Sequence, residues 1–265
     1  MKRLSLGRLA LPTYSVLALL FLMIPIVYTI VFSFNDAPAP NTTWKGFTLD
    51  HWTGVCERET LCVALTNSII IGAVSTLIAT ILGTAMAIAL VRYTFKARGA
   101  ASLSLFLPMA TPEVVLGAGL AAFFFNIGFQ AGMLTIIIAH VVFCLSFVVV
   151  TVKARVQTLD PVLEEAGRDL YANPRQVFWK ITFPLLLPGI MAAALLSFAL
   201  SFDDFIITYF NSGAVDTFPK YIYVVSRRGV PAEANVIASA VFLLAIFGVL
   251  VNQVLGAMRR KRLGL

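Results

Sequence analysis

Six long apolar runs divide this chain of 265 residues, and they restrict its fold more than any other feature. A helix needs about 20 predominantly apolar residues to cross the hydrocarbon core of a bilayer. Inside lipid the backbone N–H and C=O groups must be satisfied within the segment, so each run predicts a spanning α-helix. The predicted spans cover approximately residues 11–34, 65–91, 101–126, 133–152, 185–209 and 235–258. We therefore expect an all-α membrane protein in which residues 1–265 form a single six-span helical bundle.

The charged residues are too few to cover the surface of a soluble domain of this size. They make up 12% of the chain, against about 25% in typical soluble domains, and 59% of the residues are hydrophobic. The first apolar run follows the basic residues Lys2, Arg3 and Arg8, as in a signal peptide. Its apolar stretch is too long for a signal peptide and no small-x-small cleavage site follows, so we interpret it as a retained span.

The positions of the basic residues predict the orientation of the chain. The two termini and the second and fourth connections carry 15 Lys and Arg residues, and the other connections carry 5, which accounts for all 20. Cytoplasmic segments of membrane proteins are enriched in these residues, so we expect both termini in the cytoplasm. The net charge of +7 does not indicate nucleic-acid binding, because the basic residues flank the spans.

Two long connections, residues 35–64 and 210–234, then lie on the outer side of the membrane. Loops of this size are either docking surfaces for an external partner or inert caps on the bundle. The first of them contains Cys56 and Cys62. These two cysteines could form a disulfide if the loop faces an oxidising space, and otherwise they are free thiols.

The cytoplasmic loop 153–184, between the fourth and fifth spans, has the signals of two short helices. Asp160 can cap the first helix, with Pro161 at its first position and Glu164 at its third. Asn173 and Pro174 repeat the start signal for the second helix. Short amphipathic helices beneath a membrane bundle suit either a contact with another protein or the lipid headgroups. The four carboxylates at 160, 164, 165 and 169 disfavour an anionic membrane surface.

This loop resembles the EAA loop of the permease subunits of type I ABC importers. Glu165, Ala166 and Gly167 match the first part of that motif, and Ile181 and Pro184 match the last, at the same spacing. Phe183 replaces the usual Leu, and Tyr171 replaces a Gly that permits a sharp turn. In the family the loop is a coupling helix that sits in a groove of the cytoplasmic ATPase. The resemblance implies that the ATPase-coupling residues are Glu165, Ala166, Gly167, Asp169, Tyr171, Ile181 and Pro184.

The resemblance covers nearly the whole chain and points to the spermidine/putrescine branch, nearest to the second of its two membrane subunits. The stretches that suggest this branch are residues 112–117, 144–152 and 201–208. The family implies a bacterial inner (plasma) membrane location, a second homologous permease, two cytoplasmic ATPases and an external substrate-binding protein. It also implies that this chain holds no cofactor or metal, because ATP and Mg are bound by the ATPases.

Three acidic residues lie within the predicted spans: Glu113, Asp203 and Asp204. An ionised residue in lipid should face the bundle interior or water, and no Lys or Arg lies deep in a span to pair with these acids. We therefore predict a substrate path that accepts cations, lined by these three acids and Tyr209. Adjacent residues on a helix point about 100° apart, so Asp203 and Asp204 cannot both face one narrow path equally. His140 is interpreted as a hydrogen-bonded interior residue rather than a proton relay.

Two further patterns concern the shape of the helices. Pro108 and Pro112 should break the third span, and broken helices in membranes usually line cavities. In the second span, small residues recur at a spacing that lets helices approach closely. These residues are Gly72, Ser75, Ala79, Gly83 and Ala87.

Several motifs of enzymes are absent from the sequence. No GxxxxGK[ST] phosphate loop occurs, so the chain is not expected to hydrolyse ATP itself, and no HExxH or GxSxG motif indicates another enzyme. One alternative is an ABC permease for another solute, such as iron, a phosphonate or an organic cation. A second is a proton-driven secondary transporter that uses Glu113, Asp203 and His140, which the lack of an internal repeat disfavours.

Overall fold

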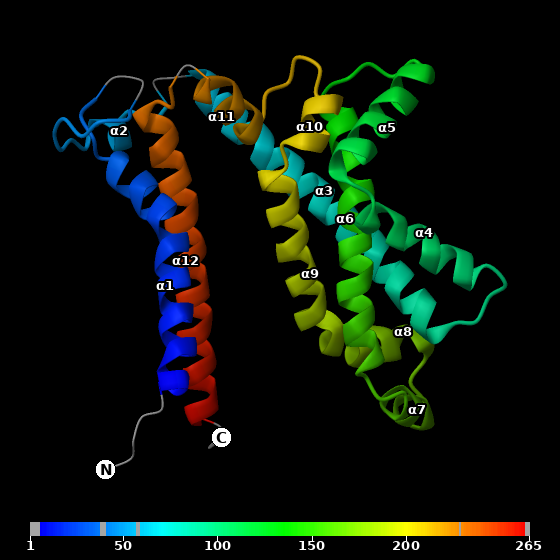
Figure 1. Ribbon diagram of the computed structural model, residues 1–265. Helices are drawn as coiled ribbons and strands as arrows, with labels where there is room; N and C mark the ends of the chain where they lie inside the picture. The colour runs from blue at the N-terminus through cyan, green and yellow to red at the C-terminus, as the bar shows by residue number, and fades with distance from the viewer. Residues whose placement is uncertain (1–5, 38–40, 57–58, 228, 263–265) are drawn as a thin grey trace, which may run out of the picture. The chain divides into compact units, whose positions relative to one another are not determined.

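A computed structural model describes residues 6–37, 41–56, 59–227 and 229–262 (Figure 1). The basic residues Lys2, Arg3, Arg58 and Arg228, which contributed to the predicted orientation, lie outside the described residues. Within the described ranges every regular element is a helix, and an isolated bridge joins Asn35 to Phe47. The helices are α1 (Leu6–Phe32), α2 (Asp50–Thr53), α3 (Glu59–Arg92), α4 (Arg98–Ala110), α5 (Glu113–Asn126), α6 (Met133–Gln157), α7 (Val162–Asp169), α8 (Pro174–Val177), the π-helix η1 (Phe178–Thr182), α9 (Phe183–Asp203), α10 (Ile206–Asn211), α11 (Phe218–Ser226) and α12 (Ala232–Arg262).

Five helical segments in the described residues are long and apolar enough to cross a membrane. They are Leu11–Phe32, Glu59–Arg92, Met133–Gln157, Pro174–Asp203 and Ala232–Val251. The predicted third span consists of α4 and α5, which together are apolar enough but are bent by 111°. Of the two prolines predicted to break it, Pro112 lies at the bend and Pro108 lies within α4.

The predicted fifth span, residues 185–209, is wrong as a continuous helix. α9 ends at Asp203, and the chain begins again as α10 at Ile206. The Asp204 carboxylate accepts hydrogen bonds from the backbone N–H groups of Ile207 (3.3 Å) and Thr208 (2.8 Å). A short polar side chain that binds the backbone in this way competes with helical hydrogen bonding and ends the helix.

The chain divides into two compact units, residues 1–62 with 222–265, and residues 63–221. In the first unit α1 packs alongside α12, as Figure 1 shows. The loop after α1 folds around the buried Asn35, whose Nδ2 donates to Asn41 Oδ1 (2.6 Å) and to the Thr43 carbonyl (2.8 Å). Cys56 and Cys62 form a disulfide with their Cα atoms 5.5 Å apart, so of the two possibilities the structure has the pair.

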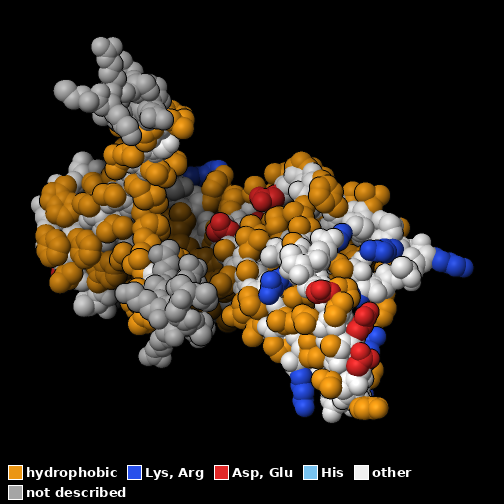
Figure 2. Space-filling view, turned by 90° about the horizontal axis from the view of Figure 1, so that it is seen from below, with side chains coloured by type: hydrophobic (Ala, Val, Ile, Leu, Met, Phe, Trp, Pro, Cys, Tyr) orange, Lys and Arg blue, Asp and Glu red, His pale blue; other side chains and the backbone are white. Residues whose placement is uncertain are grey.

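The surface of the described residues is rich in exposed apolar side chains, as lipid-facing helices require. Leu19 in α1, Leu77 in α3 and Leu195 in α9 are each 60% exposed or more. Figure 2 shows hydrophobic side chains over much of the face seen there, and the charged side chains gather mainly over a part of the 63–221 unit.

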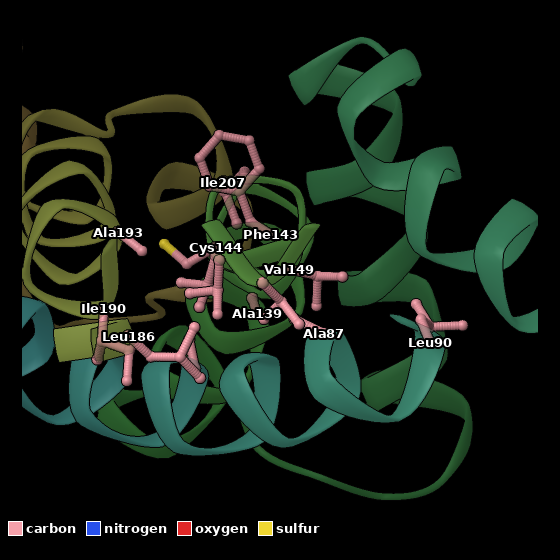
Figure 3. Packing of buried hydrophobic residues seen from close by; sticks show 14 of the residues in the cluster. Ala87, Leu90, Ala139, Phe143, Cys144, Val149, Leu186, Ile190, Ala193 and Ile207 are labelled. Carbon is pink, nitrogen blue, oxygen red and sulfur yellow. The ribbon is translucent and has the colours of Figure 1, made fainter. Parts of the chain in front are cut away.

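The core of the 63–221 unit lies where α3, α6 and α9 pack together (Figure 3). A Cβ added at Gly83 would lie 2.6 Å from Val148 Cγ1, and one added at Gly72 would lie 3.0 Å from the Phe198 ring. Ala79 and Ala87 are fully buried. The prediction that small residues of the second span permit close helix packing is therefore confirmed.

Candidate functional site

The end of α7 is a turn of defined geometry centred on Tyr171. The N–H of Tyr171 donates to the Arg168 carbonyl (2.9 Å), and the N–H of Ala172 donates to the Gly167 carbonyl (3.1 Å). This pair of bonds is the Schellman motif, which requires a left-handed residue at the turn. Tyr171 provides it with a φ of 61°. The turn that a glycine would permit is therefore formed here by a tyrosine.

The starts of both short helices follow the sequence signals, with one difference. Asn173 and Gln176 form a reciprocal capping box, with both side-chain-to-backbone bonds at 2.9 Å, as the second start signal predicted. α7 begins one residue later than predicted, at Val162, whose N–H donates to Asp160 Oδ1 (3.0 Å). The second helix does not end before the span: α8 continues through η1 directly into α9. A displacement of this loop would therefore reach α9 without an intervening turn.

α7 is held against the bundle by close packing and by an ion pair. Gly167 is buried, and a Cβ there would lie 2.6 Å from Ile181 Cδ1. The Glu164 carboxylate lies 3.2 Å from the Arg92 guanidinium and accepts a hydrogen bond from Thr182 Oγ1 (3.3 Å). Arg92 also donates to the Leu159 carbonyl (3.3 Å). Because Arg92 ends α3 and Thr182 lies in η1, these contacts connect α7 to two spanning helices.

The outer side of the loop is open. Glu165, Ala166, Asp169 and Pro184 are exposed, and Tyr171 is 98% exposed. Exposed apolar side chains lie beside these polar ones: Val162, Leu163, Leu170 and Trp179. A cavity of about 310 Å³ lies behind α7, lined by residues that include Arg92, Glu164 and Arg168. The predicted coupling residues thus fall into two sets. Glu165, Ala166, Asp169, Tyr171 and Pro184 are exposed, whereas the buried Gly167 and the half-buried Ile181 pack α7 on the bundle.

Asp203 and Asp204 at the end of α9 have different surroundings, as their spacing predicted. Asp203 is exposed and Asp204 is 8% exposed. Asp204 Oδ2 lies 3.2 Å from His140 Nε2 on α6. The partner of Asp204 is therefore a histidine, a residue type that the sequence-based prediction, made for Lys and Arg, did not include.

His140 is an interior residue with a partner at each ring nitrogen, as predicted. Its side chain is 1% exposed. Nδ1 lies 2.6 Å from Ser201 Oγ, and Nε2 lies 3.0 Å from Thr208 Oγ1 in addition to its contact with Asp204. Ser201, Asp204 and Thr208 follow one another at intervals of three or four residues, but this spacing gives no indication of a histidine on another helix.

Glu113 is exposed at the start of α5, immediately after the bend. Its helix packs on α10: a Cβ at Gly117, one helical turn after Glu113, would lie 3.1 Å from Ile207 Cα. Tyr209, on α10, is exposed and its ring lies 5.5 Å from that of Phe205. The structure thus brings the three predicted acids together, two of them exposed.

A family model described as the binding-protein-dependent transport system inner membrane component matches residues 79–263. The chain belongs to this family of ABC importer permeases. Over 257 residues the permease is 33% identical to the spermidine/putrescine transport system permease protein PotC of Escherichia coli K12, with 97% of both chains covered. It is 35% identical over 229 residues to the putrescine transport system permease protein PotI of the same strain, covering 83% of this chain and 81% of PotI.

Solved structures agree on the fold of the permease. Its backbone matches a chain of the bacterial alginate ABC transporter, determined in complex with an alginate pentasaccharide-bound periplasmic protein, with a TM-score of 0.66. That match covers 93% of the permease and 91% of the other chain at 19% sequence identity, which supports the fold alone. The family match, the similarity to PotC and the apolar helices together show a multi-pass inner-membrane protein.

Proposed function

We propose that this permease forms half of the translocation path of an ATP-driven importer of polyamines, with spermidine or putrescine as substrate. The observation that carries the proposal is the 33% identity to a spermidine/putrescine permease along 97% of both chains. Because the similarity extends over nearly the whole chain and is not confined to the loop 153–184, it favours a shared transport role.

The acids at the α5 bend and the α9–α10 break support a cationic substrate. Glu113 and Asp203 are exposed and belong to different helices. A polyamine carries several ammonium groups along a flexible chain, and carboxylates from two helices can hold successive groups. Tyr209 adds an aromatic face that suits an ammonium group. Asp204 contributes negative charge from a buried position.

The proposed importer needs partner subunits, because this chain supplies only part of it. One permease supplies one side of a path, so a second homologous permease would supply the other, with two cytoplasmic ATPases and an external substrate-binding protein. The excess of Lys and Arg on the termini and the even-numbered connections favours cytoplasmic termini, and α7 would then lie on the same side of the membrane as the ATPases. The disulfide between Cys56 and Cys62 is in keeping with an outer, oxidising position for the opposite loop.

Coupling would run through α7. ATP binding and hydrolysis on the partner ATPases supply the energy, and no cofactor or metal is expected on this chain. The exposed residues Glu165, Asp169 and Tyr171 would contact the ATPase. Movement of α7 would reach α3 through the Glu164–Arg92 pair and α9 through the contact of Gly167 with Ile181. The two spanning helices would then open the path alternately to each side.

The test is uptake by bacterial cells that lack other polyamine importers and express the complete transporter. We expect uptake of labelled spermidine that unlabelled putrescine or spermidine reduces and that ATP depletion abolishes. Reduction by an iron chelate or a phosphonate in place of polyamines would contradict the substrate. Uptake that survives ATP depletion but is lost with an uncoupler would identify a proton-driven transporter instead.

The coupling role has its own variant. Glu165→Ala should lower uptake and ATPase association by about tenfold, because Glu165 is exposed and a charged hydrogen bond across an interface contributes about 1.5–3 kcal/mol. Arg175→Ala, an exposed residue of the same loop outside the matched motif, is the control. Equal effects of the two substitutions would show that Glu165 has no special place in coupling.

A further inference from the structure

The hydrogen bonds of His140 can be assigned from the chemistry of its partners. A carboxylate only accepts hydrogen bonds, so the ring nitrogen next to Asp204, Nε2, carries a hydrogen. The other nitrogen, Nδ1, lies 2.6 Å from Ser201 Oγ, and the Ser201 hydroxyl can donate to it. His140 and Ser201 are both buried. The ring is therefore held in one orientation, with its Nε2–H facing both Asp204 Oδ2 (3.2 Å) and Thr208 Oγ1 (3.0 Å).

Asp204 in turn determines where α9 ends and where α10 begins. Its backbone is extended (φ −64°, ψ 124°), and its carboxylate accepts from the N–H groups of Ile207 and Thr208 in the first turn of α10. A buried carboxylate without partners would be costly, and His140 supplies the contact that comes from outside α10. The position of the α9–α10 break thus depends on a side chain of α6.

The opposite end of α10 is attached to the same neighbours. Asn211 Nδ2 donates to the Gly117 carbonyl of α5 (3.1 Å), and Thr135 Oγ1 of α6 donates to the Asn211 carbonyl (2.8 Å). α10 is therefore a short block fixed to α6 at both ends and to α5 one turn beyond Glu113. Asp203 lies just before this block, so the separation of Asp203 and Glu113 depends on how the block is held.

We propose that His140 is a positioning residue for substrate passage. Through Asp204 it holds the α9–α10 break so that the exposed carboxylates of Asp203 and Glu113 converge, while Asp204 itself does not touch the substrate. The inference rests on the proposed transport of polyamines, and it assigns different roles to two adjacent aspartates. The same substitution at the two positions should therefore have different effects.

The first experiment compares Asp204→Asn with Asp203→Asn in the complete transporter. An amide oxygen at the place of Asp204 Oδ2 keeps the bonds from His140 and from the Thr208 N–H, and only the longer bond from Ile207 is lost. We expect spermidine uptake within about twofold of the unchanged transporter for Asp204→Asn, and a loss of about tenfold for Asp203→Asn, which removes a charge-assisted contact. A tenfold loss for Asp204→Asn would overturn the proposal.

The second experiment asks whether His140 acts through Asp203. His140→Ala should lower spermidine uptake. The double variant His140→Ala with Asp203→Asn should take up as much spermidine as whichever single variant has the lower uptake. Losses that multiply would show that His140 acts independently, for example on stability. His140→Gln, which keeps a side-chain N–H, should restore most of the uptake. If the His140→Ala transporter does not assemble, Ser201→Ala replaces it in the comparison with Asp203→Asn, because it removes only the partner of His140 Nδ1.

The outcomes separate this inference from the proposed function. If the unchanged transporter takes up no polyamine, the proposed substrate is wrong. If it takes up polyamine but His140→Ala has no effect, or Asp204→Asn and Asp203→Asn lose uptake equally, the positioning role is wrong and the function stands. The amount of assembled complex is measured for each variant by ATPase co-purification, and uptake is expressed per complex.

Discussion

Replacing Tyr171 by glycine should make the loop 153–184 more stable. Tyr171 adopts the left-handed conformation with a φ of 61°, which costs an L-residue roughly 1–2 kcal/mol and costs glycine almost nothing. The side chain is 98% exposed, so its removal loses no packing within the chain. Glycine loses more backbone entropy on folding, by about 0.5–1 kcal/mol, which offsets part of the gain. The net stabilisation of the turn is therefore expected to be about 0.5–1 kcal/mol.

Hydrogen exchange of the turn measures this change directly. The Ala172 N–H donates to the Gly167 carbonyl only while the turn is formed, so its exchange reports the opening of the turn. Tyr171→Gly should slow that exchange by about two- to fivefold in the chain held in nanodiscs. Leu170→Gly is the matched control, because Leu170 is also exposed but has a φ of −84°, and its substitution should speed exchange. Unchanged or faster exchange in Tyr171→Gly would refute the assignment of strain to Tyr171.

Two other predictions concern the packing and the disulfide. Gly83→Ala places a Cβ 2.6 Å from Val148 Cγ1 and should lower the free energy of unfolding by about 1–3 kcal/mol, seen as a lower Tm, whereas Gly119→Ala, with no atom within 4 Å, should not lower it. A Tm that falls equally in both variants would contradict the close α3–α6 contact. A membrane-impermeant maleimide should label no thiol of the folded protein before reduction, because Cys56 and Cys62 are paired and Cys144 is buried. Two labelled thiols without reduction would show that the pair is open.

The positions of the helices could be predicted from the sequence because lipid imposes a simple rule on a chain. A segment of suitable length and hydropathy must be helical, and five long apolar helices and one bent apolar pair occupy the six predicted ranges. The starts of the short helices in loop 153–184 could also be predicted, because capping residues such as Asp160 and Asn173 act within one turn of the chain. The residues of the EAA motif then pointed to the permease family.

Contacts between distant residues could not be predicted in this way. His140 and Asp204 are 64 positions apart, and Glu164 and Arg92 are 72 apart, so neither pair follows from local spacing. The end of α9 at Asp203 was missed for the same reason: the run stays apolar up to Tyr209, and hydropathy does not register one carboxylate that binds the backbone of the next turn. Local physics thus determined which segments enter the membrane, whereas the partner of each buried polar group was decided by which helices the core brings together.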